Sequence, residues 1–246
     1  MVFDASAKAN AASLSLNDVL QVGASVQKEL YDVMLRFCKY KIAFTADVPK
    51  MYRQIIMDPR DTHFLRVFWC KQPSDRLRVL ELTTVTYGTA SALFQATRCL
   101  QQLAEDESTD YPIGAHIVKE DALSGADSLP AAVEAVKQVK GIMQKGGFSL
   151  HKWCSNSNEL LEHIPTAEQE QPATLEEYGP NGVIKVLGLL WVPKADIFQI
   201  ARPVQRSLKQ PVTERIIYSK VARLFDPLGL VSPVIVVAKL LVQRLW

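Results

Sequence analysis

Hydrophobic residues recur at helical spacing in the first 40 residues and then change to the alternation that is typical of strands. We expect a capped turn and an amphipathic helix within residues 13–40, and the apolar stripe of that helix consists of Val26, Leu30, Val33 and Phe37. Strands are predicted at residues 41–46, 63–70 and 77–85. The turn-forming residues Gln-Pro-Ser-Asp at 72–75 predict that the last two strands form a hairpin.

Helical spacing returns between residues 89 and 145. One helix is predicted at residues 89–107, and a second at 127–145, with Pro130 in its first turn and two glycines, Gly146 and Gly147, at its end. Residues 113–125, which lie between these helices, are expected to form a short hairpin.

The rest of the chain repeats the change from strands to helices. Strands are predicted at residues 148–153, 183–192 and 196–200, and two helices follow, the last beginning at Ser232 and Pro233. The order of elements predicts an α+β fold. One sheet would carry helices on one face, and a smaller lobe of strands and helices would follow it.

The composition is that of an ordinary globular protein and does not indicate a particular function. A chain of 246 residues with 48% hydrophobic residues can bury a core of ordinary size. No apolar run reaches the roughly 18 residues that a membrane span needs, so we expect no membrane partner. The start of the chain is not typical of a signal peptide.

The chain has four cysteines, and their spacing is not that of zinc ligands. We expect them to be reduced thiols in an intracellular, cytoplasmic protein. They are Cys38, Cys70, Cys99 and Cys154.

The net charge of +2 is small, but the charges are unevenly distributed. Residues 159–177 contain six glutamates and no lysine or arginine, whereas residues 202–223 contain six basic residues and the single acid Glu214. A basic segment of this kind suits contacts with nucleic-acid phosphates, although a solvated helix face explains it equally well. The candidate phosphate contacts are Arg202, Arg206, Lys209 and Arg215.

One aspartate, Asp47, follows directly after the first predicted strand. A carboxylate at a strand end is well placed to hold a metal ion, because the sheet fixes its position and the open end admits a substrate. An aspartate at this place can instead cap the next turn.

The sequence contains none of the motifs of several common enzyme classes. These classes are P-loop nucleotide-binding proteins, serine hydrolases, zinc proteases and aspartic proteases.

Two longer motifs carry a resemblance to a known family. Residues 46–55 (Ala-Asp-Val-Pro-Lys-Met-Tyr-Arg-Gln-Ile) resemble the first carboxylate motif of reverse transcriptases. Residues 82–92 (Leu-Thr-Thr-Val-Thr-Tyr-Gly-Thr-Ala-Ser-Ala) resemble their template- and nucleotide-positioning segment. The particular residues are similar to those of the BEL/Pao group of LTR retrotransposons. Further stretches with this resemblance follow in the same order and extend over nearly the whole chain, at residues 2–7, 15–18, 147–156, 186–191 and 222–230.

The resemblance implies an RNA-directed DNA polymerase that adds nucleotides with the help of two Mg²⁺ ions. Its partners would be an RNA template, a DNA primer and dNTPs, and the rest of the Pol polyprotein (protease, RNase H and integrase) would lie outside this chain. The implied domains are partial fingers at residues 1–45, a polymerase palm at 46–158, an acidic linker at 159–182 and the start of a thumb or connection at 183–246.

The same resemblance implies roles for single residues near the first carboxylate motif. Asp47 would bridge both Mg²⁺ ions, and the backbone carbonyl of Val48 would be a further metal ligand. Tyr52 would lie under the incoming sugar, while Tyr87 and Gly88 would let the backbone approach the template pair closely. Core packing is the alternative role for Tyr52.

Three more residues are implied to contact the nucleic acid. Lys152 and Trp153 would pack near the primer, and Gly188 belongs to the segment that would form the primer-gripping strand. Burial in the core is an equally good interpretation of Trp153.

The second acidic pair of such polymerases, Tyr-Val-Asp-Asp at a hairpin turn before Leu-Ser-Gly-Ala-Asp, is altered in this chain. Residues 123–127 are Leu-Ser-Gly-Ala-Asp, but Glu120 and Asp121 precede them without the tyrosine and valine. Either Glu120 and Asp121 replace the catalytic pair, with Asp121 as a metal ligand, or about five residues are missing between Glu120 and Ala122. We favour the gap, which removes roughly 17 Å of strand.

Both interpretations predict little or no polymerase activity, because a misplacement of about 1 Å can lower a rate on the order of a hundredfold. The alternative function is that of a non-catalytic retroelement remnant that binds nucleic acid through residues 202–223.

Overall fold

The computed structural model describes residues 3–119, 123–170, 183–186, 188–199, 213–222 and 226–244. These residues form a mixture of helices and strands, in agreement with the predicted α+β class. Five of the candidate site residues lie outside the described residues, and the roles given to them stay predictions: Glu120, Asp121, Arg202, Arg206 and Lys209.

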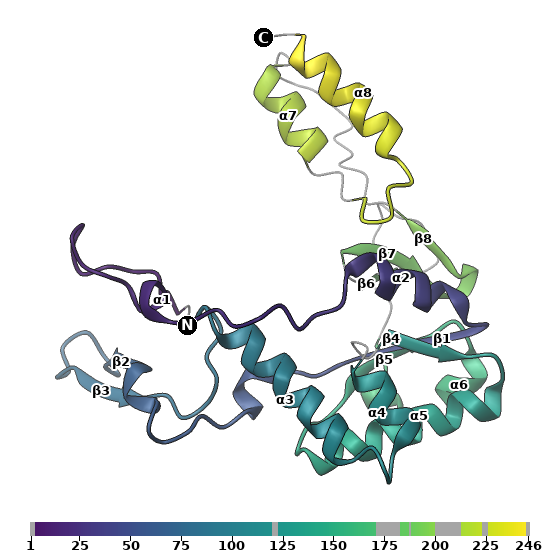
Figure 1. Cartoon of the computed structure of the whole chain (residues 1–246), viewed down its shortest axis with the longest axis horizontal. Helices are drawn as coiled ribbons and strands as arrows, with labels where there is room; N and C mark the ends of the chain where they lie inside the picture. The colour runs from purple at the N-terminus through teal and green to yellow at the C-terminus, as the bar shows by residue number, and fades with distance from the viewer. Residues whose placement is uncertain are drawn as a thin grey trace.

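A three-stranded antiparallel sheet, which we call the central sheet, lies in the lower right part of the view in Figure 1. Its middle strand is β1 (Ile42–Asp47), which pairs with β4 (Leu123–Ala126) on one side and with β5 (His151–Ser155) on the other. The predicted alternation in β1 is confirmed, because Ala43 and Phe44 are both buried but belong to different hydrophobic clusters. The two faces of the sheet are therefore both covered.

Helices cover the face of the sheet to which Phe44 belongs. They are α3 (Ala92–Asp106), α4 (Pro112–Lys119), α5 (Leu129–Lys145) and α6 (Asn158–Glu162). The helices predicted at residues 89–107 and 127–145 are thus confirmed as α3 and α5, which begin three and two residues later than predicted. In α4, Gly114 lies so close to α5 that a β-carbon would come within 2.7 Å of the Gln138 backbone. The tight contact between α4 and α5 therefore depends on a residue without a side chain.

The opposite face is covered by α2 (Leu30–Lys39) and by a second antiparallel sheet of β6 (Ile184–Val186), β7 (Leu189–Val192) and β8 (Ile197–Gln199). The ring centroids of Phe37 in α2 and Trp191 in β7 are 5.0 Å apart in an edge-to-face arrangement, and Ala43 and Cys154 belong to the same cluster. The expectation of helices on one face only is therefore wrong, because the apolar stripe of α2 is buried on the second face.

Three predictions about single elements need correction. Residues 112–119 form helix α4 and not one arm of a hairpin, because Ala115, Ile117 and Val118 are buried in the helical core. The predicted strand at 183–192 is divided into β6 and β7 at Gly188, whose φ of +86° turns the chain. Val26 lies outside α2, which begins at Leu30.

The capped turn near residue 15 is confirmed as α1 (Leu16–Val19). Ser15 and Asp18 form a reciprocal capping box, in which the side chain of each accepts a hydrogen bond from the backbone N–H of the other.

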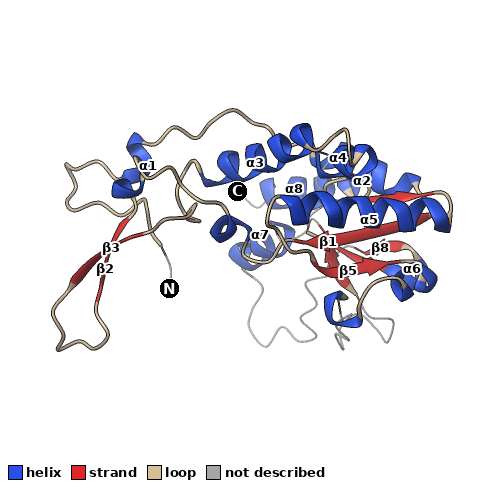
Figure 2. Cartoon of the chain, turned by 90° about the horizontal axis from the view of Figure 1, so that it is seen from below, coloured by secondary structure: helices blue, strands red, loops and turns tan. Residues whose placement is uncertain are grey.

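The predicted hairpin is confirmed as a ribbon of β2 (Arg66–Trp69) and β3 (Arg78–Glu81), with residues 72–75 in the connecting loop. Figures 1 and 2 both show this ribbon well away from the central sheet. Near the C-terminus, α7 (Glu214–Ala222) and α8 (Ser232–Gln243) pack against each other. No helix among the described residues is long and apolar enough to cross a membrane.

Cysteine labelling provides a test of the covered second face. Cys154 is buried, and this burial raises the pKa of its thiol to about 12. Since the thiolate is the reactive form, only about one molecule in ten thousand is ionised at this site at pH 8. We expect a maleimide to modify the exposed Cys99 quickly and Cys154 only after unfolding, as measured by mass spectrometry of the labelled peptides. Equal labelling of both thiols in the folded protein would show that this face is open.

Candidate functional site

Asp47 lies at the exposed end of β1, in the middle strand of the central sheet. The pairing of β1 with β5 changes register between Thr45 and Asp47, and Asp47 then stands opposite His151. The Nζ atom of Lys152 is 3.8 Å from Oδ2 of Asp47, and both side chains are 61% exposed. An ion pair of this length and exposure contributes little stability, and the exposed Asp47 carboxylate is accessible to a ligand.

Two lysines close to Asp47 have left-handed backbone conformations. Lys50, just before the short 3₁₀ helix η1 (Met51–Gln54), has a φ of +53°, and Lys152 in β5 has a φ of +55°. The described residues contain one further non-glycine residue of this kind, Asp196. Such conformations cost of order 1 kcal/mol or more and are found preferentially at functional sites.

A pocket of about 530 Å³ opens beside Asp47, and we call it the Asp47 pocket. Its walls come from the end of β1, from η1, from α3 and α5, and from the C-terminal end of α4. Most of its lining is apolar and includes Leu93, Leu100, Val118, Val139, Met143 and Leu150. The charged residues that line it among the described residues are Asp47, Lys50 and Lys119.

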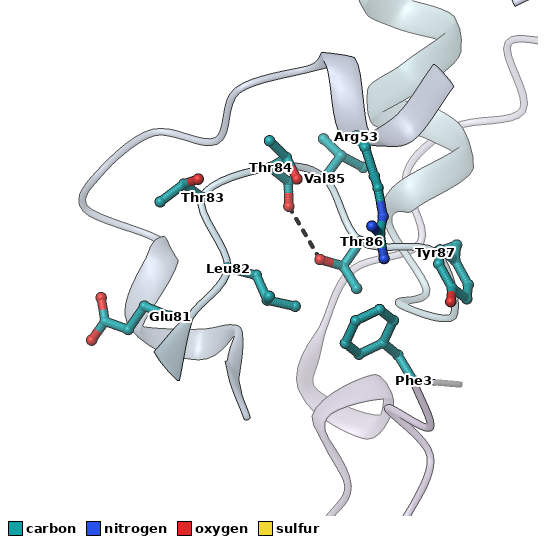
Figure 3. A pocket seen from close by; sticks show the side chains of 9 residues that line it. All are labelled: Phe3, Arg53, Glu81, Leu82, Thr83, Thr84, Val85, Thr86 and Tyr87. Atoms are coloured by element: carbon teal, nitrogen blue, oxygen red, sulfur yellow. Dashed lines mark hydrogen bonds between the residues drawn. The ribbon is translucent and has the colours of Figure 1, made fainter. Parts of the chain in front are cut away.

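A second pocket of about 570 Å³ is lined by consecutive residues of the segment after β3, and we call it the threonine pocket (Figure 3). Thr83, Thr84 and Thr86 line it, and the Thr86 hydroxyl donates a 3.1 Å hydrogen bond to the Thr84 carbonyl. The rings of Phe3 and Tyr87 meet edge to face at a centroid distance of 5.2 Å. This pocket therefore combines hydroxyl groups with an aromatic corner.

The residues of the first carboxylate motif are divided between the two pockets. Val48 and Tyr52 line the Asp47 pocket together with Asp47, whereas Arg53 lines the threonine pocket, where Figure 3 shows its side chain near Thr86. Tyr87 lines the threonine pocket, so the structure does not bring it into one pocket with Tyr52. The Tyr52 side chain is partly buried against the helical core, which agrees with the alternative role considered for it.

Gly88 follows Tyr87 in a conformation with a φ of +91°. A β-carbon on Gly88 would lie 2.7 Å from the carbonyl oxygen of Phe3. The backbone of residues 3 and 88 can approach this closely only because position 88 has no side chain.

The other predicted contacts with nucleic acid differ in their accessibility. Lys152 is largely exposed, Gly188 lies at the turn between β6 and β7, and Arg215 is exposed on α7. Trp153 is fully buried in the helical core, and Nζ of Lys140 lies 5.8 Å from its ring centroid. This burial agrees with the core role considered for Trp153, and its contact with a primer stays a prediction.

Sequence reasoning missed three basic residues at the two pockets, namely Lys50, Lys119 and Arg53. Lys50 and Arg53 belong to the motif at residues 46–55, but the motif gave no role to either. The left-handed conformation of Lys50 depends on the turn after Pro49 and has no clear sequence signal.

The described residues of the Asp47 pocket do not fit a pair of Mg²⁺ ions. Asp47 is the only acid among its described lining residues, and Val48 could add one carbonyl oxygen. In the described part of the chain, no group of three or more His, Cys, Asp or Glu residues could hold a metal ion. Two Mg²⁺ ions in a polymerase site need oxygen ligands from more than one carboxylate. We therefore assign no catalytic step to metal ions here.

Part of the chain is similar to a known protein family. Residues 213–246 match a family described as "Pao retrotransposon-like RNaseH-like domain". No curated protein matches the chain. The matched segment contains α7 and α8 and lies within the part predicted to begin the thumb or connection. The match supports an origin in a BEL/Pao retrotransposon, and the predicted domain boundaries stay predictions.

Proposed function

We propose that this chain is the palm and adjoining part of a BEL/Pao reverse transcriptase, an RNA-directed DNA polymerase by descent, that has lost its polymerase activity. Support comes from Asp47 at the open end of the middle strand, with Val48 and Tyr52 in the same pocket. The matched C-terminal segment supports the retroelement origin independently of these residues. An active ancestor would have used two Mg²⁺ ions, a primed RNA template and dNTPs.

The observation that carries the loss of activity is the short connection between α4 and β4. Helix α4 ends at Lys119 and β4 begins at Leu123, which pairs with Thr45 of β1. Only three residues separate these two elements. A hairpin with a further strand needs about two turn residues and at least three strand residues, so a hairpin carrying the second acidic pair does not fit. This count favours a gap over a replacement by Glu120 and Asp121.

Primer extension tests the proposed loss of activity. Purified protein with Mg²⁺, dNTPs and a primed RNA template is expected to give no extension above that of an Asp47→Ala variant, because the described pocket offers one carboxylate. The product would be measured on a sequencing gel with a known reverse transcriptase as positive control. Template-dependent extension that disappears in Asp47→Ala would overturn the proposal.

A second candidate function is nucleic-acid binding without catalysis. Arg215 is exposed on α7 and belongs to the basic segment at residues 202–223. We expect a fluorescent RNA–DNA duplex to bind with an affinity that falls as salt rises and that is unchanged by Asp47→Ala or EDTA. Arg215→Gln should lower the slope of log affinity against log salt by about one, while the control Lys239→Gln on α8 should leave it unchanged. Absence of binding at 50 mM salt would exclude this function.

A further inference from the structure

We infer that the Asp47 pocket binds a small organic anion with an apolar or aromatic body, and that it does so without a divalent metal. This inference rests on the proposed function in that it concerns the same pocket, which would have held the nucleotide in an active ancestor. The binding itself requires neither polymerase activity nor a template.

The charges around the pocket favour an anion. The one acid among the described lining residues, Asp47, has the cationic Lys152 beside it at 3.8 Å. Lys50 and Lys119 also line the pocket, and neither has a carboxylate partner among the described residues. The described charged groups, with Lys152 included, therefore comprise three lysines and one aspartate. A ligand with one or two negative oxygens would complete this arrangement of charges.

The apolar lining of the pocket favours a ligand whose uncharged part is apolar or aromatic. Val139, Met143 and Leu150 are buried core residues that also line the pocket, and Leu93 and Leu100 of α3 lie on its wall. A volume of about 530 Å³ is within the range of sites for small organic molecules. Thr97 and Gln101 add polar groups from the same helix. An aromatic body against the apolar wall would leave its anionic group free to reach the lysines.

The strained backbone on both sides of Asp47 provides a further argument. Left-handed non-glycine residues persist where the surrounding structure requires them, and they cluster at ligand-binding sites. Here the two residues are Lys50 on the pocket lining and Lys152 beside the carboxylate. Both left-handed residues are thus lysines, one on the lining of the pocket and the other beside its acid.

Binding would be measured with two probes in buffer that contains EDTA. The first is 1-anilinonaphthalene-8-sulfonate, an aromatic anion followed by fluorescence, and the second is dTMP, followed by calorimetry. The double variant Lys50→Glu, Lys119→Glu should weaken both by at least about tenfold. The control Lys239→Glu on α8 should change them less than twofold, which excludes binding to the exposed apolar residues of that helix.

The variant Asp47→Asn separates a metal-free site from a metal-dependent one. Without the negative charge, a metal-free anion site should bind both probes equally well or severalfold more tightly in EDTA. Binding that needs Mg²⁺ and is lost in Asp47→Asn would overturn the inference. In a Thr97→Trp variant, the added ring would fill the pocket from α3. This variant should bind both probes more weakly than the unmodified chain, while its melting temperature stays unchanged.

The remaining outcomes distinguish the source of the ligand. Binding of both probes, with dTMP displacing the sulfonate, would indicate a nucleotide. Binding of the sulfonate alone would indicate another aromatic anion, and both results support the inference. Affinities that stay within twofold after reversal of both lysine charges would overturn it. A polymerase-active chain would overturn the proposed loss of activity but would leave this test unaffected.

Discussion

Replacement of Trp153 by alanine is expected to lower the free energy of unfolding by about 3–5 kcal/mol. The side chain is fully buried between the central sheet and the helices, where Phe44 lies at a ring-centroid distance of 6.2 Å. Removal of an indole from a packed core leaves a cavity that neighbouring side chains fill only in part. Urea unfolding followed by circular dichroism measures the change.

Two variants make this result specific. Lys152→Ala changes the exposed neighbour of Trp153 and should alter the stability by about 0.5 kcal/mol or less. Trp153→Phe keeps an aromatic ring and removes the indole N–H, for which the described structure provides no acceptor, so it should cost clearly less than the alanine variant. If Trp153 contacts a primer instead, Trp153→Ala would weaken nucleic-acid binding and leave the unfolding midpoint unchanged.

The elements that could be predicted are those with strong local signals. β1 has both the alternation of a strand and a polar end, and its middle position in the sheet explains why Ala43 and Phe44 are both buried. For α5, apolar residues at helical spacing coincide with Pro130 near the start and Gly147, with a φ of +77°, just after the end. Local sequence and tertiary packing specify the same structure in these segments, which is why the predictions are correct.

The failures occur where the structure is decided by contacts distant in sequence. Residues 112–119 are mostly apolar and contain β-branched residues, so that a short strand and a buried helix cannot be distinguished by pattern alone. The close approach of Gly114 to Gln138 on α5 favours the helix. The second covered face was missed for a similar reason, since Phe37 and Trp191 are 154 positions apart in the chain and meet only after folding.

The candidate site shows the same division. The position of Asp47 at a strand end could be read from the motif and from the alternation before it. The separation of Tyr52 and Tyr87 into different pockets depends on the path of the chain through η1 and the ribbon, which the motif does not encode. The cationic surroundings of Asp47 depend on two backbone conformations that lysine rarely adopts.

Insertion of five residues, Asp-Phe-Tyr-Val-Asp, between Glu120 and Asp121 is expected to raise template-dependent primer extension at least about a hundredfold above the unmodified chain. The insertion would create Tyr-Val-Asp-Asp directly before Ala122 and would lengthen the connection between α4 and β4 enough for a hairpin. In the described sheet, β4 is an edge strand, so that a new strand has a free edge to pair with. The added carboxylates would supply metal ligands that the described residues of the Asp47 pocket do not offer.

Two controls decide whether restored activity comes from the carboxylates and not from the longer connection. The same insertion with asparagine in place of both inserted aspartates keeps the length and should remain inactive. Asp47→Ala combined with the original insertion should also be inactive, because both metal ions would share this carboxylate. If Glu120 and Asp121 instead replace the catalytic pair, any weak activity of the unmodified chain should disappear in Glu120→Ala, and the insertion should add nothing. The gap therefore predicts a large gain in activity from the five added residues, whereas the replacement predicts no gain.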